Sequence, residues 1–412
     1  MRWIKTVAAA AIAGLLYACT TPPAIAPTPP APAGEVRTPV TILISIDGFR
    51  ADYLDRGITP ALSRLATAGA RGAMRPAFPT KTFPNHYAIV TGLVPDRNGI
   101  VANRFEDPAR PGETFTMAVT DPYWWEQGEP IWVAAEKAGI RTATMFWPGS
   151  NVKIQGAYPS DWQQFSQQVS GRQRVDAVID WMRRPAATRP RFATLYFDVV
   201  DTAGHRFGPD AAETNAVLRD VDALIGRLTD ELAALGQPAN LVIVADHGMA
   251  AASTERLIRL DQIANPQDYR VIEEGPFATI EPQPGRGAAL AAALRKPHPR
   301  MQCWRQAEIP ARLRYGRNPR VASFLCLAET GWMIATKPPA EPWHGGNHGW
   351  DNAAPEMQAL FIASGPAFAA GVRLPPFDNV DVYPLLRTLI GLPAAPGIDG
   401  DDSALRPALR AR

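Results

Sequence analysis

Three apolar segments, each followed closely by metal-binding side chains, constrain the fold most strongly. Residues 40–46 are Val-Thr-Ile-Leu-Ile-Ser-Ile, and similar runs occupy residues 192–197 and 241–245. Such runs are typical of strands buried on both faces of a parallel sheet. Asp47 follows the first run, Asp201 lies just beyond the second, and Asp246-His247 follow the third. Because open α/β sheets bind ligands beyond the carboxyl ends of their strands, these side chains are expected to share one site.

Helical patterns alternate with these strands. Apolar residues recur every three or four positions from Val217 to Leu235, and Gly236 provides a stop. Further strands are expected at residues 142–146 and 358–363, with a last helix at 382–390. The sequence therefore predicts an α/β fold in which a mostly parallel central sheet is flanked by helices.

Residues 269–335 have a different character. They mix short strand patterns, an Ala/Leu-rich helix at 287–294 and two cysteines, Cys303 and Cys326. This composition predicts a small α+β subdomain, inserted at about residues 265–340, that caps the site.

The N-terminus has the pattern of a bacterial export signal. Arg2 and Lys5 precede an apolar stretch, which ends in Leu16-Tyr17-Ala18-Cys19. This ending resembles a lipobox, which predicts a signal peptide over residues 1–18 and lipidation of Cys19. Plain signal cleavage is the alternative, because Tyr17 is unusual at its position. The Pro/Ala-rich residues 19–38 would then tether a protein of the bacterial cell envelope, expected in the periplasm, to the outer membrane.

The cysteine count fits this compartment. Only three cysteines occur in 412 residues, so lipidation of Cys19 would leave Cys303 and Cys326 as a pair. In an oxidising compartment we expect these two to form a disulfide; two unpaired buried thiols are the alternative.

Charge gives little information about partners. With 42 basic and 40 acidic residues, the formal net charge is +2. No overall basic field attracts nucleic acid, so an anionic substrate would be attracted locally, by bound metal ions.

Two further segments carry oxygen and nitrogen ligands. Residues 80–86 are Thr-Lys-Thr-Phe-Pro-Asn-His, and residues 346–349 are Gly-Asn-His-Gly. Imidazole and carboxylate groups are preferred ligands of zinc. Asp201 and His205 are four residues apart, but Gly204 between them makes a loop as reasonable as one helix face.

Residues 78–87, together with Val90-Thr91-Gly92, Pro95 and Gly99-Ile100, match a known motif almost letter for letter. They resemble the nucleophile region of the nucleotide pyrophosphatase/phosphodiesterase family in the alkaline phosphatase superfamily. The resemblance extends from about residue 38 to the C-terminus. It implies an alkaline phosphatase-like catalytic domain over residues 39–412 and two Zn²⁺ ions per chain.

The resemblance also implies a role for each matching residue. One zinc would be held by Asp47, Thr82, Asp246 and His247, and the other by Asp201, His205 and His348. Thr82 would be the nucleophile and Asn103 would bind a non-bridging phosphoryl oxygen. Phe83 and Tyr196 would stack on the two faces of a nucleotide base.

The chemistry of these residues supports the same roles. A threonine hydroxyl is a poor nucleophile until a metal ion lowers its pKa. A helix beginning near Thr82 would direct its N-terminal amides at the phosphoryl group. A neutral amide at Asn103 favours a phosphodiester, because the extra charge of a monoester is better met by arginine or a third cation.

Several neighbouring residues are expected to have structural roles. His86 would lie behind the nucleophile and His298 in a loop. His344 would lie beside the ligands or be exposed, and Asp198 would lie beside the ligands or have a structural role. Trp124 and Trp125 are expected in the core, with a position on the substrate cleft as the alternative.

The predicted function is hydrolysis of phosphodiester and pyrophosphate bonds in nucleotides. The reaction would release nucleoside 5′-monophosphates through a phosphothreonine intermediate. The alternatives within the superfamily are a phosphomonoesterase, a phosphonate hydrolase, and a phosphodiesterase or transferase acting on lipid head groups. A binding protein without activity is the alternative outside enzymes, and the complete ligand set argues against it. No stable nucleic-acid complex is expected.

Overall fold

A computed structural model describes residues 36–411 of the chain. The predicted signal peptide, Cys19 and nearly all of the tether lie outside the described residues, so these assignments stay predictions. Within residues 36–411, no helix combines the length and the apolar character needed to cross a bilayer.

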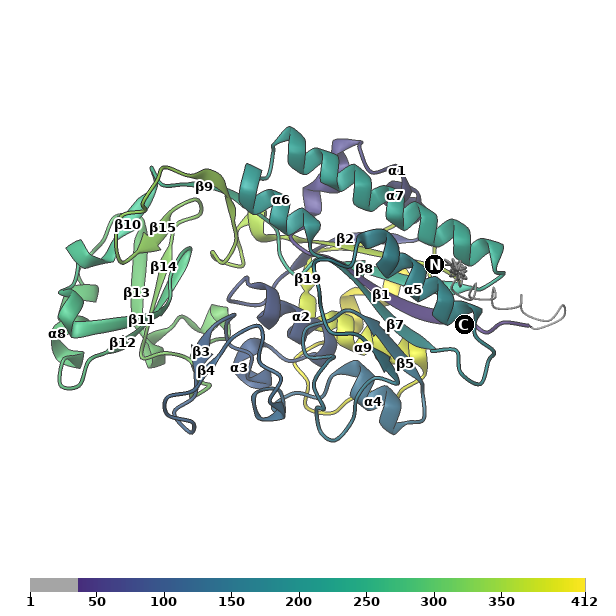
Figure 1. Cartoon of the computed structure of the whole chain (residues 1–412), viewed down its shortest axis with the longest axis horizontal. Helices are drawn as coiled ribbons and strands as arrows, with labels where there is room; N and C mark the ends of the chain where they lie inside the picture. Colours follow the sequence, from purple (N-terminus) through teal and green to yellow (C-terminus); the bar gives the residue numbers. More distant parts are fainter. Residues whose placement is uncertain (1–35, 412) are drawn as a thin grey trace, which may run out of the picture.

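The central sheet has nine strands (Figure 1). Their order across the sheet is β18 (Val372–Arg373), β2 (Ala70–Arg75), β17 (Ala359–Ser364), β8 (Ala239–Val244), β1 (Val40–Ile46), β7 (Phe192–Phe197), β5 (Thr142–Met145) and β6 (Asp161–Trp162), with β19 (Phe377–Asp378) also paired to β2. Every residue of β1 and of β7 is buried. The apolar runs therefore mark the middle of the sheet.

The strand predictions are confirmed, with one difference in direction. β1 is parallel to both β7 and β8, and β5 is parallel to β7. β17, in contrast, runs antiparallel to both of its neighbours, β2 and β8. The sheet is thus mixed, although most of its pairings are parallel.

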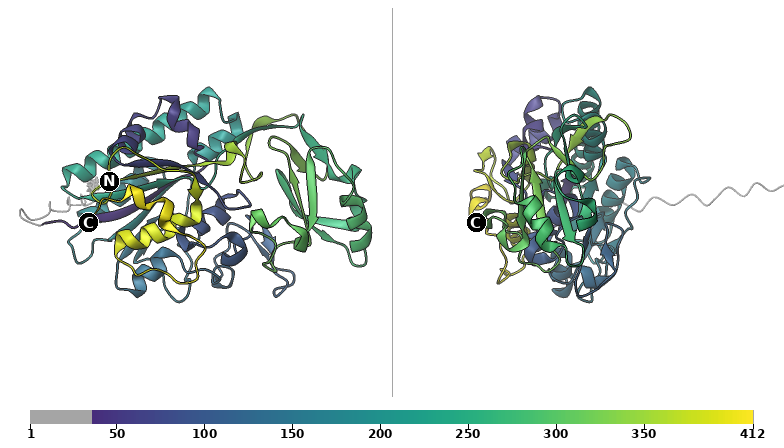
Figure 2. Two further views of the ribbon diagram at one scale, coloured as in Figure 1. Left: turned by 180° about the vertical axis from the view of Figure 1, so that it is seen from behind. Right: turned by 90° about the vertical axis from the view of Figure 1, so that its left-hand side faces the viewer.

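Helices cover both faces of the sheet (Figures 1 and 2). One face carries α1 (Pro60–Ala68), α5 (Gly171–Arg183), α6 (Val199–Phe207) and α7 (Ala212–Ala234). The other carries α2 (Thr82–Thr91), α3 (Pro95–Asn98), α4 (Ile131–Lys137) and α9 (Val382–Ile390). The predicted apolar stripe forms α7, Gly236 follows it with a φ of 61°, and α9 has its predicted bounds.

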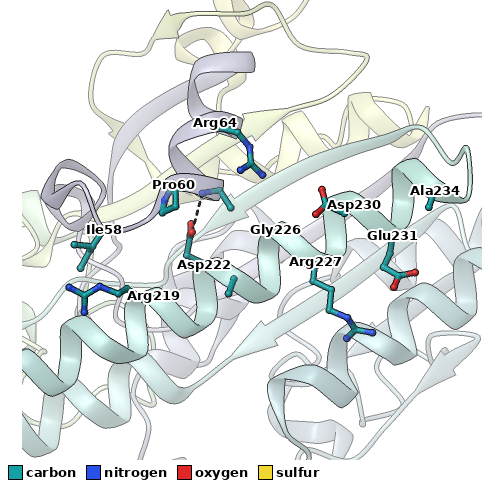
Figure 3. A pocket seen from close by; sticks show the side chains of 12 residues that line it. Ile58, Pro60, Arg64, Arg219, Asp222, Gly226, Arg227, Asp230, Glu231 and Ala234 are labelled. Carbon is teal, nitrogen blue, oxygen red and sulfur yellow. Dashed lines mark hydrogen bonds between the residues drawn. The ribbon is translucent and has the colours of Figure 1, made fainter.

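A groove of about 790 Å³ runs between α1 and α7 on the outer surface (Figure 3). Its one buried carboxylate belongs to Asp222, which accepts hydrogen bonds from the backbone N–H groups of Ala61 (3.0 Å) and Leu62 (2.8 Å). These bonds cap the N-terminus of α1. The groove thus lies along the packing contact between α1 and α7.

A second sheet lies at the end of the molecule away from both labelled termini (Figure 1). It is antiparallel, in the order β11 (Tyr269–Glu273), β12 (Phe277–Pro282), β14 (Phe324–Ala328) and β13 (Met301–Arg305), and α8 (Gly287–Leu294) belongs to the same part of the chain. Cys303 and Cys326 are direct partners on β13 and β14 and form the predicted disulfide. We call this part the inserted subdomain.

Short ribbons complete the structure. β10 (Leu257–Arg259) pairs in parallel with β15 (Met333–Ala335). β3 (Phe105–Glu106) pairs with β4 (Thr114–Phe115). β9 (Ala250–Ser253) pairs antiparallel with β16 (His344–Asn347). The chain thus leaves the central sheet along β9 and returns along β16, which brings His348 back beside Asp246 and His247.

Candidate metal centre and substrate cavity

The loops after β1, β7 and β8 meet closely at the carboxyl ends of these strands. Gly48, directly after Asp47, has a φ of 70°, and its N–H donates to Asp246 Oδ1 (3.2 Å). A Cβ atom at Gly48 would lie 3.0 Å from the Cα of Asp201. Glycine is therefore required here both for the backbone conformation and for the close approach of the three carboxylates.

The first group of candidate ligands consists of Asp47, Asp246 and His247. His247 Nε2 lies 2.9 Å from Asp246 Oδ2 and 3.6 Å from Asp47 Oδ1. All three side chains are buried. Each of the three can direct one atom at a common point, as a metal ion requires.

The second group consists of Asp201, His205 and His348. Asp201 and His205 lie on α6, so the helical reading of their spacing is confirmed. Asp201 Oδ1 is 3.4 Å from His205 Nε2 and 3.5 Å from His348 Nε2. The ring of His348 stacks on that of His247 with centroids 3.5 Å apart. The two groups are therefore immediate neighbours, as in a two-metal site.

The carboxylates of this centre fit bound cations. Asp47 Oδ1, Asp201 Oδ1 and Asp246 Oδ2 are buried, and none of them has a hydrogen-bond partner among residues 36–411. Burial, reinforced by the charges of Asp246 and Asp201, raises the pKa of Asp47 well above its usual value. Three buried carboxylates held this closely repel one another, and cations bound between them would relieve that repulsion.

The histidines are oriented as metal ligands are. His205 Nδ1 lies 2.9 Å from Gly346 O, and His348 Nδ1 lies 2.8 Å from Thr80 O. A carbonyl oxygen can only accept, so each Nδ1 donates and each Nε2 lone pair faces the centre. Burial and the neighbouring His247 lower the pKa of His348 well below its usual value. His348 is therefore neutral, which is the form that binds metal.

Thr82 is the first residue of α2, and its Oγ1 lies 3.4 Å from His247 Nε2. Behind it, His86 is fully buried, with Nδ1 2.9 Å from Thr82 O and Nε2 2.8 Å from Ser45 Oγ. Burial lowers the pKa of His86. The neutral ring therefore donates to the carbonyl of Thr82 and accepts from Ser45, which is a structural role behind the nucleophile.

Asn103 lies in the bend before β3, next to the start of α2. Its Oδ1 accepts a hydrogen bond from the N–H of Phe83 (3.0 Å). In the described part of the chain its Nδ2 has no partner, so this group is available to a ligand. Because Phe83 donates to Asn103 and Pro84 has no N–H, the helix N-terminus offers an anion fewer amides than predicted.

These groups open onto a cavity of about 680 Å³. Its lining includes Asp47, Thr82, Asn103, Asp201, His205 and His348, together with the aromatic residues Phe83, Trp125, Phe146, Trp147, Phe165 and Tyr196. Lys81 also lines the cavity, whereas Arg104 is exposed elsewhere. A metal centre beside an aromatic chamber is suited to a ligand that has both a phosphoryl group and a flat apolar part.

Tyr196 lines the same cavity as Phe83. Its ring is 8% exposed and makes edge-to-face contacts with His86 and Phe165, and its hydroxyl donates to Asp47 Oδ2 (2.6 Å). Stacking of this ring on a base stays a prediction, whereas the hydroxyl has a defined partner. Tyr196 therefore orients the carboxylate of Asp47.

Phe165 is a further aromatic residue at the cavity, and no sequence motif predicts it. It follows β6 in a loop, it is 41% exposed, and it lines the cavity as Phe83 does. The loop contains no motif, so only the contact with Tyr196 in the folded chain shows its place.

The other residues discussed from the sequence lie outside the two groups of candidate ligands. Asp198 accepts a hydrogen bond from Arg174 (2.7 Å). His298 bonds to the carbonyl of Ala293, and His344 is exposed. Trp124 is buried against Phe105 and Phe115, whereas Trp125, also buried, both lines the cavity and packs against Phe83.

Comparison with known proteins identifies relatives of the whole fold. Residues 41–351 match the family model "Type I phosphodiesterase / nucleotide pyrophosphatase". The chain is 36% identical over 400 residues to human ectonucleotide pyrophosphatase/phosphodiesterase family member 1, covering 93% of this chain but 43% of that protein. It is 38% identical over 363 residues to bis(5′-adenosyl)-triphosphatase enpp4 of Xenopus laevis, covering 87% of this chain and 79% of the relative.

Solved structures agree with these matches. Human ectonucleotide pyrophosphatase/phosphodiesterase 5 superimposes with a TM-score of 0.86 at 34% identity, covering 90% of this chain and 100% of that one. The murine counterpart, in a form described as inactive and in complex with AMP, has the same TM-score at 33% identity, with the same coverage of both chains. The chain therefore belongs to the nucleotide pyrophosphatase/phosphodiesterase family and has the α/β fold of the alkaline phosphatase superfamily.

Proposed function

We propose that this protein is a zinc-dependent enzyme that hydrolyses phosphodiester and pyrophosphate bonds in nucleotides and releases nucleoside 5′-monophosphates. The observation that carries the proposal is the position of the Thr82 hydroxyl, 3.4 Å from His247 at the edge of the ligand cluster. The AMP bound by the murine family member supports a nucleotide substrate. The relatives named above support the same class of reaction.

The two ligand groups would each hold one zinc ion. Asp47, Asp246 and His247, joined by Thr82, would form one site, and Asp201, His205 and His348 would form the other. When bound, the ions would lower the pKa of a coordinated hydroxyl or water and neutralise charge on the phosphoryl oxygens. Tyr196 would hold Asp47 in the orientation that this site needs.

Thr82 and Asn103 have separate roles in the reaction. The Thr82 oxygen forms a bond to phosphorus while the bond to the leaving oxygen breaks, and that oxygen departs as an alcohol or a phosphate. The free Nδ2 of Asn103 donates to a non-bridging oxygen. Water then attacks phosphorus from the side opposite the Thr82 oxygen, the bond between phosphorus and that oxygen breaks, and a proton from the water returns to Thr82. Two inversions give net retention at phosphorus.

The preference for a diester provides the main test. We expect kcat/KM for the nitrophenyl ester of a nucleoside 5′-phosphate to exceed that for nitrophenyl phosphate by roughly 10³-fold or more. Among residues 36–411 no arginine lines the cavity to meet a monoester's second charge, and Lys81, which does line it, lies 4.0 Å from the carboxylate of Glu273. Both substrates release the same chromophore, so one assay of the zinc-loaded protein compares them. Preference for the monoester would mean that the enzyme is a phosphatase.

The aromatic chamber supports the nucleotide part of the proposal. Replacing Phe165 by alanine is expected to raise KM for nucleotide diesters about 10-fold, because one stacking partner of a base contributes on the order of 1–3 kcal/mol. KM for bis(nitrophenyl) phosphate serves as the reference. Tyr158→Ala removes another aromatic ring of similar exposure, 39%, outside the cavity lining, and is expected to change neither KM. Equal losses on both substrates in Phe165→Ala would refute base stacking.

A further inference from the structure

A loop of the inserted subdomain is joined to the active site by buried hydrogen bonds. We propose that residues 313–321 act as a clamp that sets the position of Asn103, with Tyr315 as the positioning residue nearest to it. The inference rests on the proposed function, because it assigns a purpose to Asn103 in phosphoryl binding. It gives the inserted subdomain a task in catalysis.

The first contact of the clamp is made by Asp96, at the start of α3. Its carboxylate accepts hydrogen bonds from the backbone N–H groups of Gly316 (2.9 Å), Arg317 (2.8 Å) and Asn318 (3.0 Å). Asn318 Nδ2 in turn donates to the carbonyl of Asp96 (3.1 Å). Because three backbone N–H groups of the loop donate to one carboxylate, the loop is held in a fixed position against α3.

The second contact is made by Arg320, whose side chain is 1% exposed. It donates to Asp107 Oδ2 (2.7 Å) and to the carbonyls of Gly99 (2.9 Å) and Trp124 (2.8 Å). Its guanidinium also lies over the rings of Tyr123 and Trp124. One arginine thus holds both ends of the segment from Gly99 to Trp124, which contains Asn103.

The third contact lies nearest to the chemistry. The hydroxyl of Tyr315 donates to the carbonyl of Val101 (3.0 Å), two residues before Asn103. Its ring packs edge-on against Phe78, with centroids 5.3 Å apart, and Phe78 precedes the nucleophile segment. Tyr315 therefore touches both segments whose relative position brings Asn103 to Phe83 and Thr82.

The segment itself needs such support. Between α3 and β3, residues 99–104 form neither helix nor strand, so no regular backbone ladder holds them. Asn103 must nevertheless keep Oδ1 on the N–H of Phe83 and direct Nδ2 at the phosphoryl group. A displacement of about 1 Å at such a group can lower a rate 10²-fold. The clamp therefore holds Asn103 in a position that the segment alone does not fix.

The test is a double-mutant cycle that combines Tyr315→Phe with Asn103→Ala. Tyr315→Phe removes one hydroxyl and keeps the ring against Phe78. We expect it to lower kcat on the nucleotide diester about fivefold to tenfold, with KM changed less than twofold, because the phosphoryl contact matters most in the transition state. In the Asn103→Ala background the same substitution should change kcat less than twofold.

A matched control uses the same chemical change elsewhere in the subdomain. Tyr269 is 6% exposed, and its hydroxyl has no hydrogen-bond partner in the described chain. Tyr269→Phe is expected to leave kcat unchanged. If Tyr315→Phe fails to fold, Asp96→Asn tests the same clamp through a different contact and should show the same dependence on Asn103.

The outcomes separate the clamp from the proposed function. Equal losses from Tyr315→Phe with and without Asn103, or no loss in either background, would overturn the clamp and leave the diesterase intact. If Asn103→Ala alone keeps full activity, the role of Asn103 in the proposed function fails, and the clamp fails with it. Loss of thermal stability without loss of kcat would show that the loop is structural only.

Discussion

Replacing Thr82 by alanine is expected to lower kcat on nucleotide diesters by on the order of 10⁵-fold, because removal of a covalent nucleophile costs an enzyme about this much. Thr80, the other threonine of this segment, is not placed to act instead. Thr80, two residues earlier, is fully buried and donates its hydroxyl to the carbonyl of Trp350 (3.0 Å). The loss is measured with the zinc-loaded variant in the diesterase assay.

Two controls separate chemistry from assembly. Thr82→Ser keeps a hydroxyl at the start of α2 and should retain measurable turnover and form the phosphorylated enzyme on rapid acid quenching, which Thr82→Ala should not. The zinc content of Thr82→Ala should stay close to two ions per chain, because six other ligands remain. Turnover that survives the alanine substitution at full zinc content would exclude the threonine mechanism.

The sequence allowed prediction of the parts of the site that follow directly from strand ends. Asp47 and Asp246-His247 each come directly after a largely apolar run, and such a run is buried in the sheet in almost any α/β arrangement. The chain direction of β17 could not be found in this way. An apolar run gives burial but no direction, and the antiparallel pairing of β17 depends on how the chain returns from the inserted subdomain.

The contacts of Tyr196 could not be predicted for a similar reason. β7 is buried on both faces, so its sequence does not alternate and cannot show which way the ring of Tyr196 points. The structure directs its hydroxyl to Asp47 and brings a further ring to the same cavity, that of Phe165, from a loop more than thirty residues earlier. A contact between distant loops leaves no periodic pattern in the sequence.

The sequence also does not show which arginines are buried. Arg312 and Arg320 lie in one arginine-rich stretch, and nothing in their spacing distinguishes them. Arg312 pairs with Asp351 at the surface, with its side chain 52% exposed, whereas Arg320 is 1% exposed and pairs with the buried Asp107. Only the folded chain shows that one arginine has a buried partner and several buried carbonyls to satisfy.

Removing the metal ions with a chelator is expected to abolish turnover and to lower Tm by about 5–15 °C. At a metal concentration roughly 1,000 times Kd, binding stabilises the folded state by about 4 kcal/mol, and each kcal/mol moves Tm by a few degrees in a chain of this size. Without ions, Asp47, Asp201 and Asp246 keep buried oxygens that have no hydrogen-bond partner in residues 36–411. The apo-protein therefore carries a cluster of carboxylates that favours unfolding.

The measurement is differential scanning calorimetry of chelated and zinc-reloaded protein, followed by the diesterase assay. Reloading with zinc should restore both Tm and activity. Asp47→Asn provides the matched variant: it keeps the shape of the side chain but removes one of the three charges, so the Tm difference between apo and reloaded protein should become smaller. If chelation leaves Tm unchanged while metal analysis shows that no ion remains, the carboxylate cluster is satisfied without metal, and the proposed two-zinc centre is excluded.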